Sequence, residues 1–320
     1  MSFAALLASM AEKSILVVGD VMLDEYIFGK ATRISPEAPV MVVRQERTAR
    51  LPGGAANVAK NVIAFGAKTH LIGLVGEDEA ADLLETALGE EAIPNSLLRD
   101  PDRTTTRKTR VVADHRHQVL RIDHEVESAL TDEREQALID HVVEELGHHD
   151  ALILSDYRKG CLTERVARAL HQAAKQTWKP LIVNPKPASL SFYRGATVIS
   201  LNRGEASEAW GQPVDAKNAA EAASSLRDAN RAEAVVVTLG EAGMVVAGPQ
   251  TFAVAAPRVE VADPAGAGDT VIATVALGVA AMGFDRSVFE LAAEAAASVV
   301  RHVGVATVTA DDLDRLGAPS

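Results

Sequence analysis

The sequence has little cysteine, few aromatic residues and no long apolar run. Its one cysteine, Cys161, excludes an internal disulfide and a cysteine-rich metal cluster, and we interpret it as a structural residue. Residues 1–13 lack an early basic region and include Glu12, so they do not resemble a signal peptide. No apolar stretch reaches the length of about 18 residues that a membrane helix needs. Together these absences favour a cytoplasmic protein.

Positive charge is also scarce. The chain has 32 Lys and Arg residues against 44 Asp and Glu residues, which gives a formal net charge of -12. This balance argues against wholesale binding to nucleic acid or to an anionic membrane, although a local basic pocket can still hold a phosphorylated substrate. Small molecules are therefore the expected partners. With 320 residues, 48% of them apolar, the chain can bury a large core, and we expect a single domain over residues 1–320.

Short apolar runs rich in β-branched residues alternate with alanine-rich helical patterns. The runs are unbroken, as in strands that are covered on both faces, so they predict a doubly wound α/β fold with a mainly parallel sheet. Strands are expected at residues 15–18, 69–74, 151–154, 181–183, 197–200 and 234–238, and two packed helices at 270–281 and 288–300. Ligands bind beyond the carboxyl ends of parallel strands, so the residues that end these runs are candidates for chemistry.

Two segments have a different pattern. Residues 21–47 and 104–123 carry alternating polar and apolar side chains, as in the sequence Thr109-Arg110-Val111-Val112. Alternation is typical of strands with one covered face. We therefore expect a small β-sheet flap, or lid, beside the core.

The segment from Asp263 to Thr270 is the most informative part of the sequence. Its Gly-Ala-Gly turn precedes a helical pattern, so backbone N–H groups and the helix N-terminus can bind an anion such as a transferred phosphate. Asp269 then lies in the first turn, where it can accept the proton of a hydroxyl aligned with that phosphate. The alternative is that Asp269 only caps the helix.

A second group of residues suits a polyol. Asp20 follows the first strand and can accept hydrogen bonds from sugar hydroxyls, Gly53 and Gly54 allow close backbone approach, and Asn57 offers a donor and an acceptor. Each has a structural alternative when taken alone, namely a loop residue for Asp20, a turn for the glycines and a helix cap for Asn57.

Five motifs together resemble those of ribokinase-like (PfkB) carbohydrate kinases in order and spacing. The resemblance extends from about Ser14 to Thr309 and implies the ribokinase-like fold, ATP as the phosphoryl donor and a homodimer formed through the flap. The motifs are Gly19-Asp20, Gly53-Gly54-Ala55-Ala56-Asn57, Asn202-Arg203-Gly204-Glu205, Thr238-Leu239-Gly240-Glu241-Ala242-Gly243 and Gly266-Ala267-Gly268-Asp269.

A narrower resemblance is to the bacterial D-glycero-D-manno-heptose-7-phosphate kinases of lipopolysaccharide core synthesis. It implies phosphorylation of the anomeric hydroxyl to give heptose 1,7-bisphosphate and ADP. Many such kinases are fused to a cytidylyltransferase whose His-x-Gly-His signature does not occur here, so we expect the stand-alone form and a separate cytidylyltransferase later in the pathway. The motifs that carry it are Val18-Gly19-Asp20-Val21-Met22-Leu23-Asp24, Arg33-Ile34-Ser35-Pro36-Glu37-Ala38-Pro39-Val40, Pro52-Gly53-Gly54-Ala55-Ala56-Asn57-Val58-Ala59 and Leu154-Ser155-Asp156-Tyr157-x-Lys159-Gly160.

The family resemblance also implies roles for single residues. Asp269 is the base, and the anion hole around the transferred phosphate is formed by Gly266, Ala267 and Gly268. The implied sugar contacts are Asp20, Gly53, Gly54 and Asn57. The implied nucleotide contacts are Asn202, Thr238, Gly240, Gly243, Gly266, Gly268 and, beside the adenine, Ala295. Mg²⁺ and its waters would be ordered by the Asn-x-x-Glu pair Asn202 and Glu205, since a hard cation prefers oxygen ligands.

A substrate that already carries a phosphate needs fixed positive charge at its far end. Each candidate lies near a strand end, on the flap or in a turn, and solvated surface charge is the alternative for each. The candidates are Lys186, which we favour, Arg110, Arg33 and Lys159.

The sequence departs from the family pattern at two places. Asn184 stands where relatives often have Asp, which lowers the negative charge near a possible metal site. Pro264 and Ala265 stiffen the turn before Gly266 and remove a hydroxyl. Neither change removes the base or the glycines.

Other functions fit the sequence less well. The histidines at 115, 117, 148 and 149 lack metal-ligand spacing, and neither a P-loop nor a dinucleotide-binding glycine motif occurs. The alternatives that remain are a kinase for another sugar phosphate or nucleoside, and a catalytically silent sugar-binding regulator. Retention of Asp269, the glycines and Glu205 counts against the regulator, because a binding protein does not need the phosphoryl-transfer residues.

Overall fold

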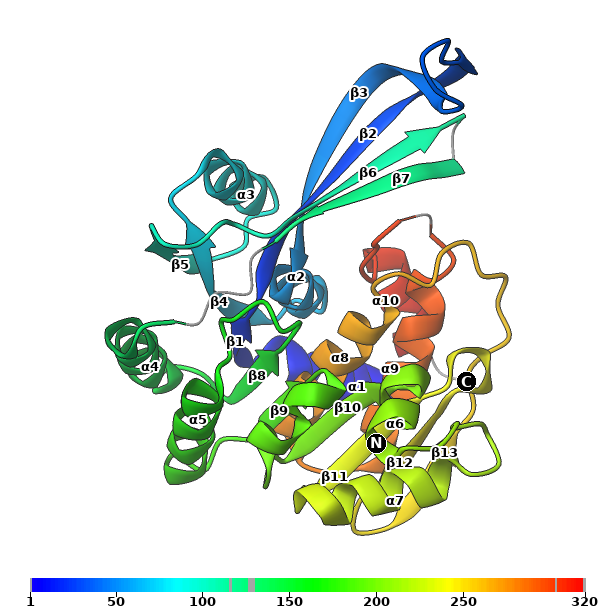
Figure 1. The fold of residues 1–320 in the computed structure, drawn as a ribbon. Coiled ribbons are helices and arrows are strands. Elements are labelled where there is room, and N and C mark those ends of the chain that lie inside the picture. The colour runs from blue at the N-terminus through cyan, green and yellow to red at the C-terminus, as the bar shows by residue number, and fades with distance from the viewer. Residues whose placement is uncertain (1, 115–116, 126–129, 303, 319–320) are drawn as a thin grey trace.

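The computed structural model describes residues 2–114, 117–125, 130–302 and 304–318, which form a nine-stranded sheet between helices and a separate four-stranded sheet (Figure 1). The order of the large sheet is β13-β12-β11-β10-β9-β8-β1-β4-β5. Its strands are β1 (Ser14–Gly19), β4 (Lys68–Gly76), β5 (Asn95–Asp100), β8 (Ala151–Ser155), β9 (Leu181–Asn184), β10 (Val198–Asn202), β11 (Ala234–Thr238), β12 (Met244–Ala247) and β13 (Thr251–Val254).

The large sheet is mainly parallel, as its unbroken apolar runs predict. Every pairing from β11 to β5 is parallel, and each predicted run falls on one of these strands, although β10 begins one residue after the start of its predicted run. The antiparallel pairs β11–β12 and β12–β13 extend one edge. The predicted doubly wound α/β fold is confirmed.

Alternate residues of each central strand pack into two different cores. On β1, Ile15 and Val17 contact one core, and Leu16 and Val18 contact the other. The first core is formed with α1 (Phe3–Ala11), α2 (Ala55–Ala64), α3 (Glu79–Glu90), α8 (Ala267–Met282), α9 (Arg286–Val299) and α10 (Ala310–Gly317). The second is formed with α4 (Asp132–Leu146), α5 (Glu164–Gln176), α6 (Arg203–Trp210), α7 (Ala219–Asn230) and the 3-10 helix η1 (Pro187–Tyr193). Both faces are therefore covered, and this is why the strands are apolar throughout.

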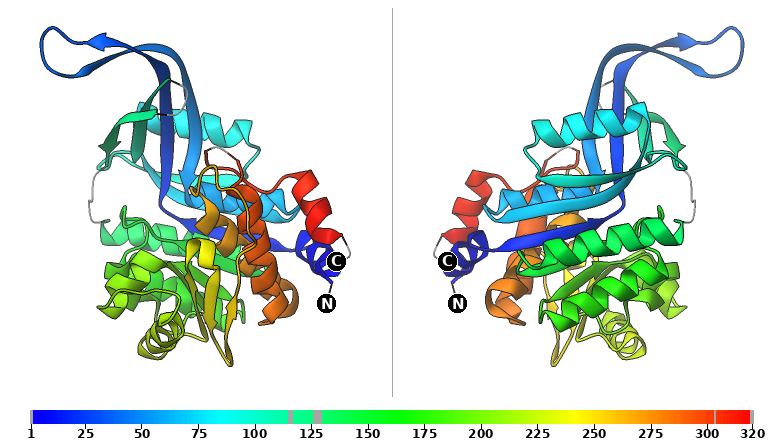
Figure 2. Two further views of the ribbon diagram at one scale, coloured as in Figure 1. Left: turned by 90° about the vertical axis from the view of Figure 1, so that its right-hand side faces the viewer. Right: turned by 90° about the vertical axis from the view of Figure 1, so that its left-hand side faces the viewer.

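The four-stranded sheet is a flap that projects from the body (Figures 1 and 2). Its order is β3-β2-β6-β7, with β2 parallel to β6 and the other pairs antiparallel. Its strands are β2 (Val21–Ile34), β3 (Met41–Gly54), β6 (Arg107–Ala113) and β7 (His117–His124).

The flap joins the core at Asp20 and Gly54. Strand β1 continues into β2 at Asp20, and β3 continues into α2 at Gly54. The amide of Ala55 donates to the carbonyl of Asp20 (2.9 Å). Gly54 has φ of 63°, and a Cβ there would lie 2.3 Å from the Asp20 carbonyl oxygen, so only glycine fits this crossing. The carboxyl end of β1 and the base of the flap therefore meet at one place.

No helix among the described residues combines the length and apolar character that crossing a bilayer requires.

Candidate active site

The first turn of α8 places Asp269 at the centre of the candidate site. Helix α8 begins at Ala267 after Gly266, whose φ of 83° is left-handed. A Cβ built on Gly268 would meet nothing within 4 Å, so the space above this turn is open. The first turn of an α-helix has backbone N–H groups without partners inside the helix, and the positive end of the helix dipole lies there. The turn can therefore bind an anion beside the Asp269 carboxylate.

The Asp269 carboxylate is buried and has one donor on each oxygen. The Asn57 amide donates to Oδ2 (2.5 Å), and the Tyr157 hydroxyl donates to Oδ1 (3.2 Å). Burial raises the pKa of Asp269 to about 6, while these two hydrogen bonds and the charge of Lys186 act to lower it. The carboxyl therefore titrates near neutrality, which suits a general base.

A polar cavity of about 160 Å³ opens next to Asp269 at the carboxyl edge of the large sheet. Its walls come from strand ends and the segments that follow them, from the first turn of α6 and from the α8 turn. The lining residues are Tyr157, Asn184, Lys186, Ser200, Asn202, Glu205, Thr238, Gly266, Gly268 and Asp269. This is the position at which open parallel sheets bind ligands.

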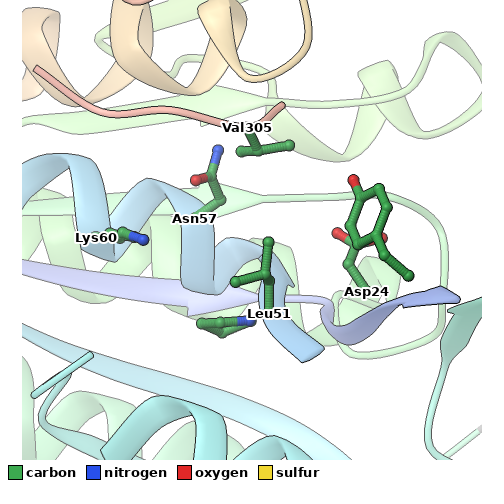
Figure 3. A pocket seen from close by; sticks show the side chains of 7 residues that line it. Asp24, Leu51, Asn57, Lys60 and Val305 are labelled. Atoms are coloured by element: carbon green, nitrogen blue, oxygen red, sulfur yellow. The ribbon is translucent and has the colours of Figure 1, made fainter. Parts of the chain in front are cut away.

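A second, smaller cavity lies under the base of the flap (Figure 3). Asn57 is on its wall and also donates to Asp269, so the two cavities meet at this pair. Its lining residues are Asp24, Tyr26, Leu51, Pro52, Asn57, Lys60 and Val305. Its volume is about 10 Å³, and it presents one carboxylate, one amide and one ammonium group, which are groups that can hydrogen-bond sugar hydroxyls.

Asp24 was missed by the sequence analysis. Asp24 is 9% exposed, and its carboxylate forms an ion pair with Arg110 and lies in the cavity beside Asn57. A Cβ on Gly53 would lie 2.1 Å from Asp24 Oδ2, so the glycine makes room for this carboxylate. The available signal was its place at the end of the motif from Val18 to Asp24 that the sequence shares with heptose-7-phosphate kinases.

Asp20 faces protein backbone. Its side chain accepts hydrogen bonds from the amides of Tyr157 (2.8 Å), Lys159 (2.9 Å) and Cys161 (3.0 Å). Asp20 is 2% exposed, and burial raises its pKa to about 6 against the effect of these three amides. Asp20 thus ties β1 to the segment after β8, and its expected contact with sugar hydroxyls stays a prediction.

Asn202 and Glu205 form the N-terminal capping box of α6. The Asn202 side chain accepts from the Glu205 amide, and the Glu205 side chain accepts from the Asn202 amide, both at 2.9 Å. The other Glu205 oxygen pairs with Lys186 (2.6 Å). Lys186, expected at the far end of the substrate, thus lies at the same end of the site as the Asn-x-x-Glu pair.

The remaining predicted nucleotide residues fall in different environments. Thr238 ends β11 and lines the larger cavity, and Gly240 begins the 3-10 helix η2 (Gly240–Ala242) with open space around it. A Cβ on Gly243 would lie 2.0 Å from the Val254 carbonyl oxygen, so this glycine permits close packing on β13. Ala295 is fully buried within α9.

Cations gather on the face of the flap that carries Asp24, which we call the inner face. Lys108 and Arg110 alternate along β6 beside Asp24 and Tyr26, and Arg110 lies directly opposite Arg121 of β7. Lys108 and Arg121 were missed as candidates, although the alternating pattern of their strands was the available signal. Two arginines that face each other across strands repel unless an anion lies nearby.

Acidic side chains partly balance these cations. Lys108 pairs with Asp123 (3.1 Å) and Glu125 (3.4 Å), and Lys159 pairs with Glu125 (2.8 Å). Arg121 pairs with Asp123 (2.9 Å). Of the predicted candidates, Arg110 and Lys159 thus belong to this network, whereas Arg33 is exposed near the tip of the flap.

Cys161 and the described histidines take structural positions. Cys161 is buried, and its amide donates to Asp20. His149 contacts the Ser14 hydroxyl (2.8 Å) at the amino end of β1, at the opposite end of that strand from Asp20. His148 follows α4, His117 begins β7, and His115 lies outside the described residues.

Comparison of the sequence with known proteins gave matches over nearly its whole length. Residues 12–312 match the profile of the family described as pfkB family carbohydrate kinase. The chain is 41% identical over 320 residues to the bifunctional protein HldE of Bradyrhizobium sp. (strain ORS 278), covering 98% of this chain and 65% of that protein. It is 42% identical over 318 residues to the protein of the same name from Nitrobacter winogradskyi, with the same coverage. The chain thus spans about 65% of the length of these curated relatives.

Comparison of the structure with solved structures gave the same fold. Phosphofructokinase-2 from Escherichia coli in complex with potassium superposes with a TM-score of 0.80 at 20% identity, covering 96% of this chain and 98% of that chain. Ribokinase from Arabidopsis thaliana, complexed with ribose and ATP, superposes with a TM-score of 0.72 at 18% identity, covering 97% of this chain and 100% of that chain. The fold of the chain is therefore ribokinase-like.

Proposed function

The chain belongs to the pfkB family of carbohydrate kinases, and from this premise we propose that it phosphorylates D-glycero-D-manno-heptose 7-phosphate at the anomeric hydroxyl. The products would be heptose 1,7-bisphosphate and ADP, in the route to ADP-heptose and the lipopolysaccharide core, where a cytidylyltransferase would act later. The heptose substrate rests on the four sequence motifs shared with heptose-7-phosphate kinases. We place the reaction in the cytoplasm.

The observation that carries this proposal is the position of Asp269 between two unlike cavities. One side offers Asp24, Asn57 and the inner face of the flap, and the other offers the α8 turn and the strand ends. A sugar on the first side would present its hydroxyl to the carboxylate, opposite a γ-phosphate on the second. In-line transfer needs this alignment. The protein would contribute mainly by positioning the two substrates and by stabilising charge, without a covalent intermediate.

Asp269 would accept the proton of the attacking hydroxyl as its oxygen bonds to the γ-phosphorus and the bond from that phosphorus to the leaving ADP oxygen breaks. Charge that develops on the transferred phosphoryl group would be stabilised by the backbone N–H groups from Gly266 to Gly268 and by the helix dipole. Thr238 and Gly240 would contact the nucleotide phosphates. Closure of the flap would exclude water, which otherwise competes with the sugar as acceptor.

Oxygen ligands for Mg²⁺ are present at the nucleotide end. Glu205 and Asn202 supply carboxylate and amide oxygens, but the Glu205 oxygens already accept from Lys186 and from the Asn202 amide. The set fits a hydrated Mg²⁺ that is held through water and the nucleotide phosphates. The ion would neutralise phosphate charge when bound. Lys186 would act beside it as a phosphate contact, which replaces our expectation that it binds the far end of the sugar phosphate.

The inner face of the flap would hold the phosphate that the sugar already carries. Lys108, Arg110 and Arg121 form a row there, each paired with a carboxylate, and a phosphate dianion would compete for the same donors. Lys159 adds a fourth cation through the shared Glu125. This row favours a sugar phosphate over an unphosphorylated sugar or a nucleoside.

The opposite face of the flap supports a homodimer. Leu120 and Ile122 alternate with Arg121 and are 51% and 53% exposed, and Ile34 and Met41 near the tip are 62% and 41% exposed. Burial of these side chains against a second copy would stabilise the flap. Sedimentation velocity at micromolar concentration measures this association directly.

Replacement of the base tests the proposed chemistry. With ATP, Mg²⁺ and heptose 7-phosphate, we expect Asp269→Asn to lower kcat for ADP release by about 10²- to 10⁴-fold, because the amide cannot accept the proton. Calorimetry should show heptose 7-phosphate binding within about threefold of wild type. Turnover close to that of wild type would rule out Asp269 as the base.

A further inference from the structure

The phenol of Tyr157 is the second hydrogen-bond partner of Asp269. Tyr157 follows the end of β8 and lies in the wall of the larger cavity. Its hydroxyl donates to Asp269 Oδ1, on the opposite oxygen from the one that Asn57 contacts. A carboxylate has about four acceptor sites, so two donors leave sites for a sugar hydroxyl.

The backbone that carries Tyr157 is fixed by Asp20 on one side. Three amides of the segment from Tyr157 to Cys161 donate to the buried Asp20 carboxylate. Within this segment Arg158 has φ of 57°, a left-handed conformation that a non-glycine residue adopts only when its surroundings enforce it. Asp20 supplies that enforcement from the end of β1.

The same segment is fixed by Asp156 on the other side. Its buried carboxylate accepts from the hydroxyls of Ser189 (2.5 Å) and Tyr193 (2.7 Å) and from the amide of Arg158 (2.7 Å). Two carboxylates thus hold one short turn. Because Asp20 follows β1 and Asp156 follows β8, the position of the Tyr157 side chain is set by residues at the carboxyl edge of the large sheet.

Electrostatics keep the Tyr157 hydroxyl protonated. The negative charge of Asp269 and burial hold the pKa of the phenol well above its usual range. The Lys186 ammonium lies 5.2 Å from the centroid of the ring, on which it can form a cation–π contact. The phenol is therefore a donor to Asp269 throughout the working pH range.

We infer that Tyr157 is a positioning residue for the base, holding the Asp269 carboxylate jointly with Asn57 in the orientation that faces the sugar hydroxyl. The inference rests on the proposed function, in which Asp269 accepts the proton of that hydroxyl. Asp20 contributes through the backbone of residues 157–161. The hydrogen bond also favours the ionised carboxylate and so offsets part of the effect of burial on its pKa.

Tyr157→Phe tests this role because it removes the hydroxyl and keeps the ring. We expect kcat with heptose 7-phosphate to fall about 10- to 100-fold from loss of alignment, and KM for ATP to change less than about twofold. The acidic limb of the kcat profile should move to higher pH, because the ionised carboxylate loses a donor. An unchanged limb together with kcat within twofold of wild type would overturn the inference.

Thr69→Val is the control. It removes another buried hydroxyl, which donates to the Ile15 carbonyl near the amino end of β1 and contacts neither Asp269 nor the segment that carries Tyr157. We expect this variant to have a lower melting temperature but an unchanged acidic limb of the kcat profile. That result would separate an effect on stability from an effect on the position of the base. If Tyr157→Phe does not fold, 3-fluorotyrosine at position 157 supplies a stronger donor and should move the limb to lower pH, and no movement would count against the inference.

A direct titration separates this inference from the proposed function. The ¹³C carboxyl resonance that disappears in Asp269→Asn identifies Asp269, and its pKa can be compared between wild type and Tyr157→Phe without any sugar. Absence of sugar phosphorylation by the wild type would refute the function alone. Equal pKa values in the two proteins would refute the hydrogen bond on which the positioning role depends.

Discussion

At the scale of the residue, the environment of Asp269 combines two opposing demands. A base should be ionised near neutral pH, yet burial favours its protonated form and raises the pKa to about 6. Asn57 and Tyr157 donate to the ionised form and limit that rise. The carboxylate is thus poised close to the pH at which it must exchange a proton.

This environment predicts the pH dependence of turnover. A carboxyl with a raised pKa works as a base only above that pKa, so kcat should be constant above about pH 7 and fall tenfold per unit below about pH 6. The profile of kcat is the one to record, since substrate phosphate itself titrates near about pH 6 and affects binding. A kcat that stays constant down to pH 4.5 would contradict the ionisation of Asp269 as described.

The two aspartates of the first strand and flap show what a sequence does and does not reveal at this scale. Asp20 was a reasonable sugar ligand because it ends an apolar strand, but three amides from a segment more than 130 residues away occupy its carboxylate. Asp24 reaches the cavity because β2 continues past the sheet edge. Neither outcome is local, so neither could be predicted from spacing alone.

At the scale of the element, one face of the flap carries several cations that come from different strands. The sequence of one strand alone does not show this face. Lys108 and Arg110 share β6 with apolar neighbours, and Arg121 comes from β7. Only the strand register brings the two arginines opposite each other. This charge arrangement is the main physical support for a phosphorylated sugar.

Neutralising substitutions test the cation row. We expect Lys108→Gln and Arg121→Gln each to raise KM for heptose 7-phosphate about tenfold or more, from the loss of a charge-assisted hydrogen bond. KM for the unphosphorylated heptose should be unaffected. Lys30→Gln, an exposed lysine elsewhere on the flap, is the control. Equal effects on both sugars would place the substrate phosphate outside this row.

Elements with strong apolar character were the most predictable. Six of the seven parallel strands, and the helices α8 and α9, lie where unbroken apolar runs and alanine-rich patterns indicate, whereas β5 was not predicted. The strands β12 and β13 were not predicted, since they are four residues each and gain stability from pairing at the sheet edge. Pairing of that kind depends on the tertiary structure, which overrides weak local preference.

At the scale of the whole molecule, the fold joins three distant parts of the chain at one point. The end of β1, the start of α2 and the start of α8 bring Asp20, Asn57 and Asp269 together, and the flap grows from the same junction. Closure of the flap would therefore act on the sugar and on the base at once. The family, the fold and the sugar-kinase class follow from the structure and from the comparisons with known proteins. The proposed identity of the sugar is supported by the sequence motifs and by the row of cations on the flap.

A substrate panel tests that central claim most directly. ADP release is measured with ATP, Mg²⁺ and, separately, D-glycero-D-manno-heptose 7-phosphate, fructose 6-phosphate, ribose, adenosine and no sugar. We predict kcat/KM for the heptose phosphate at least about 100-fold above that for any other acceptor. Preference for another acceptor would contradict the heptose assignment, and silence across the panel with sugar binding still measurable would contradict the kinase itself.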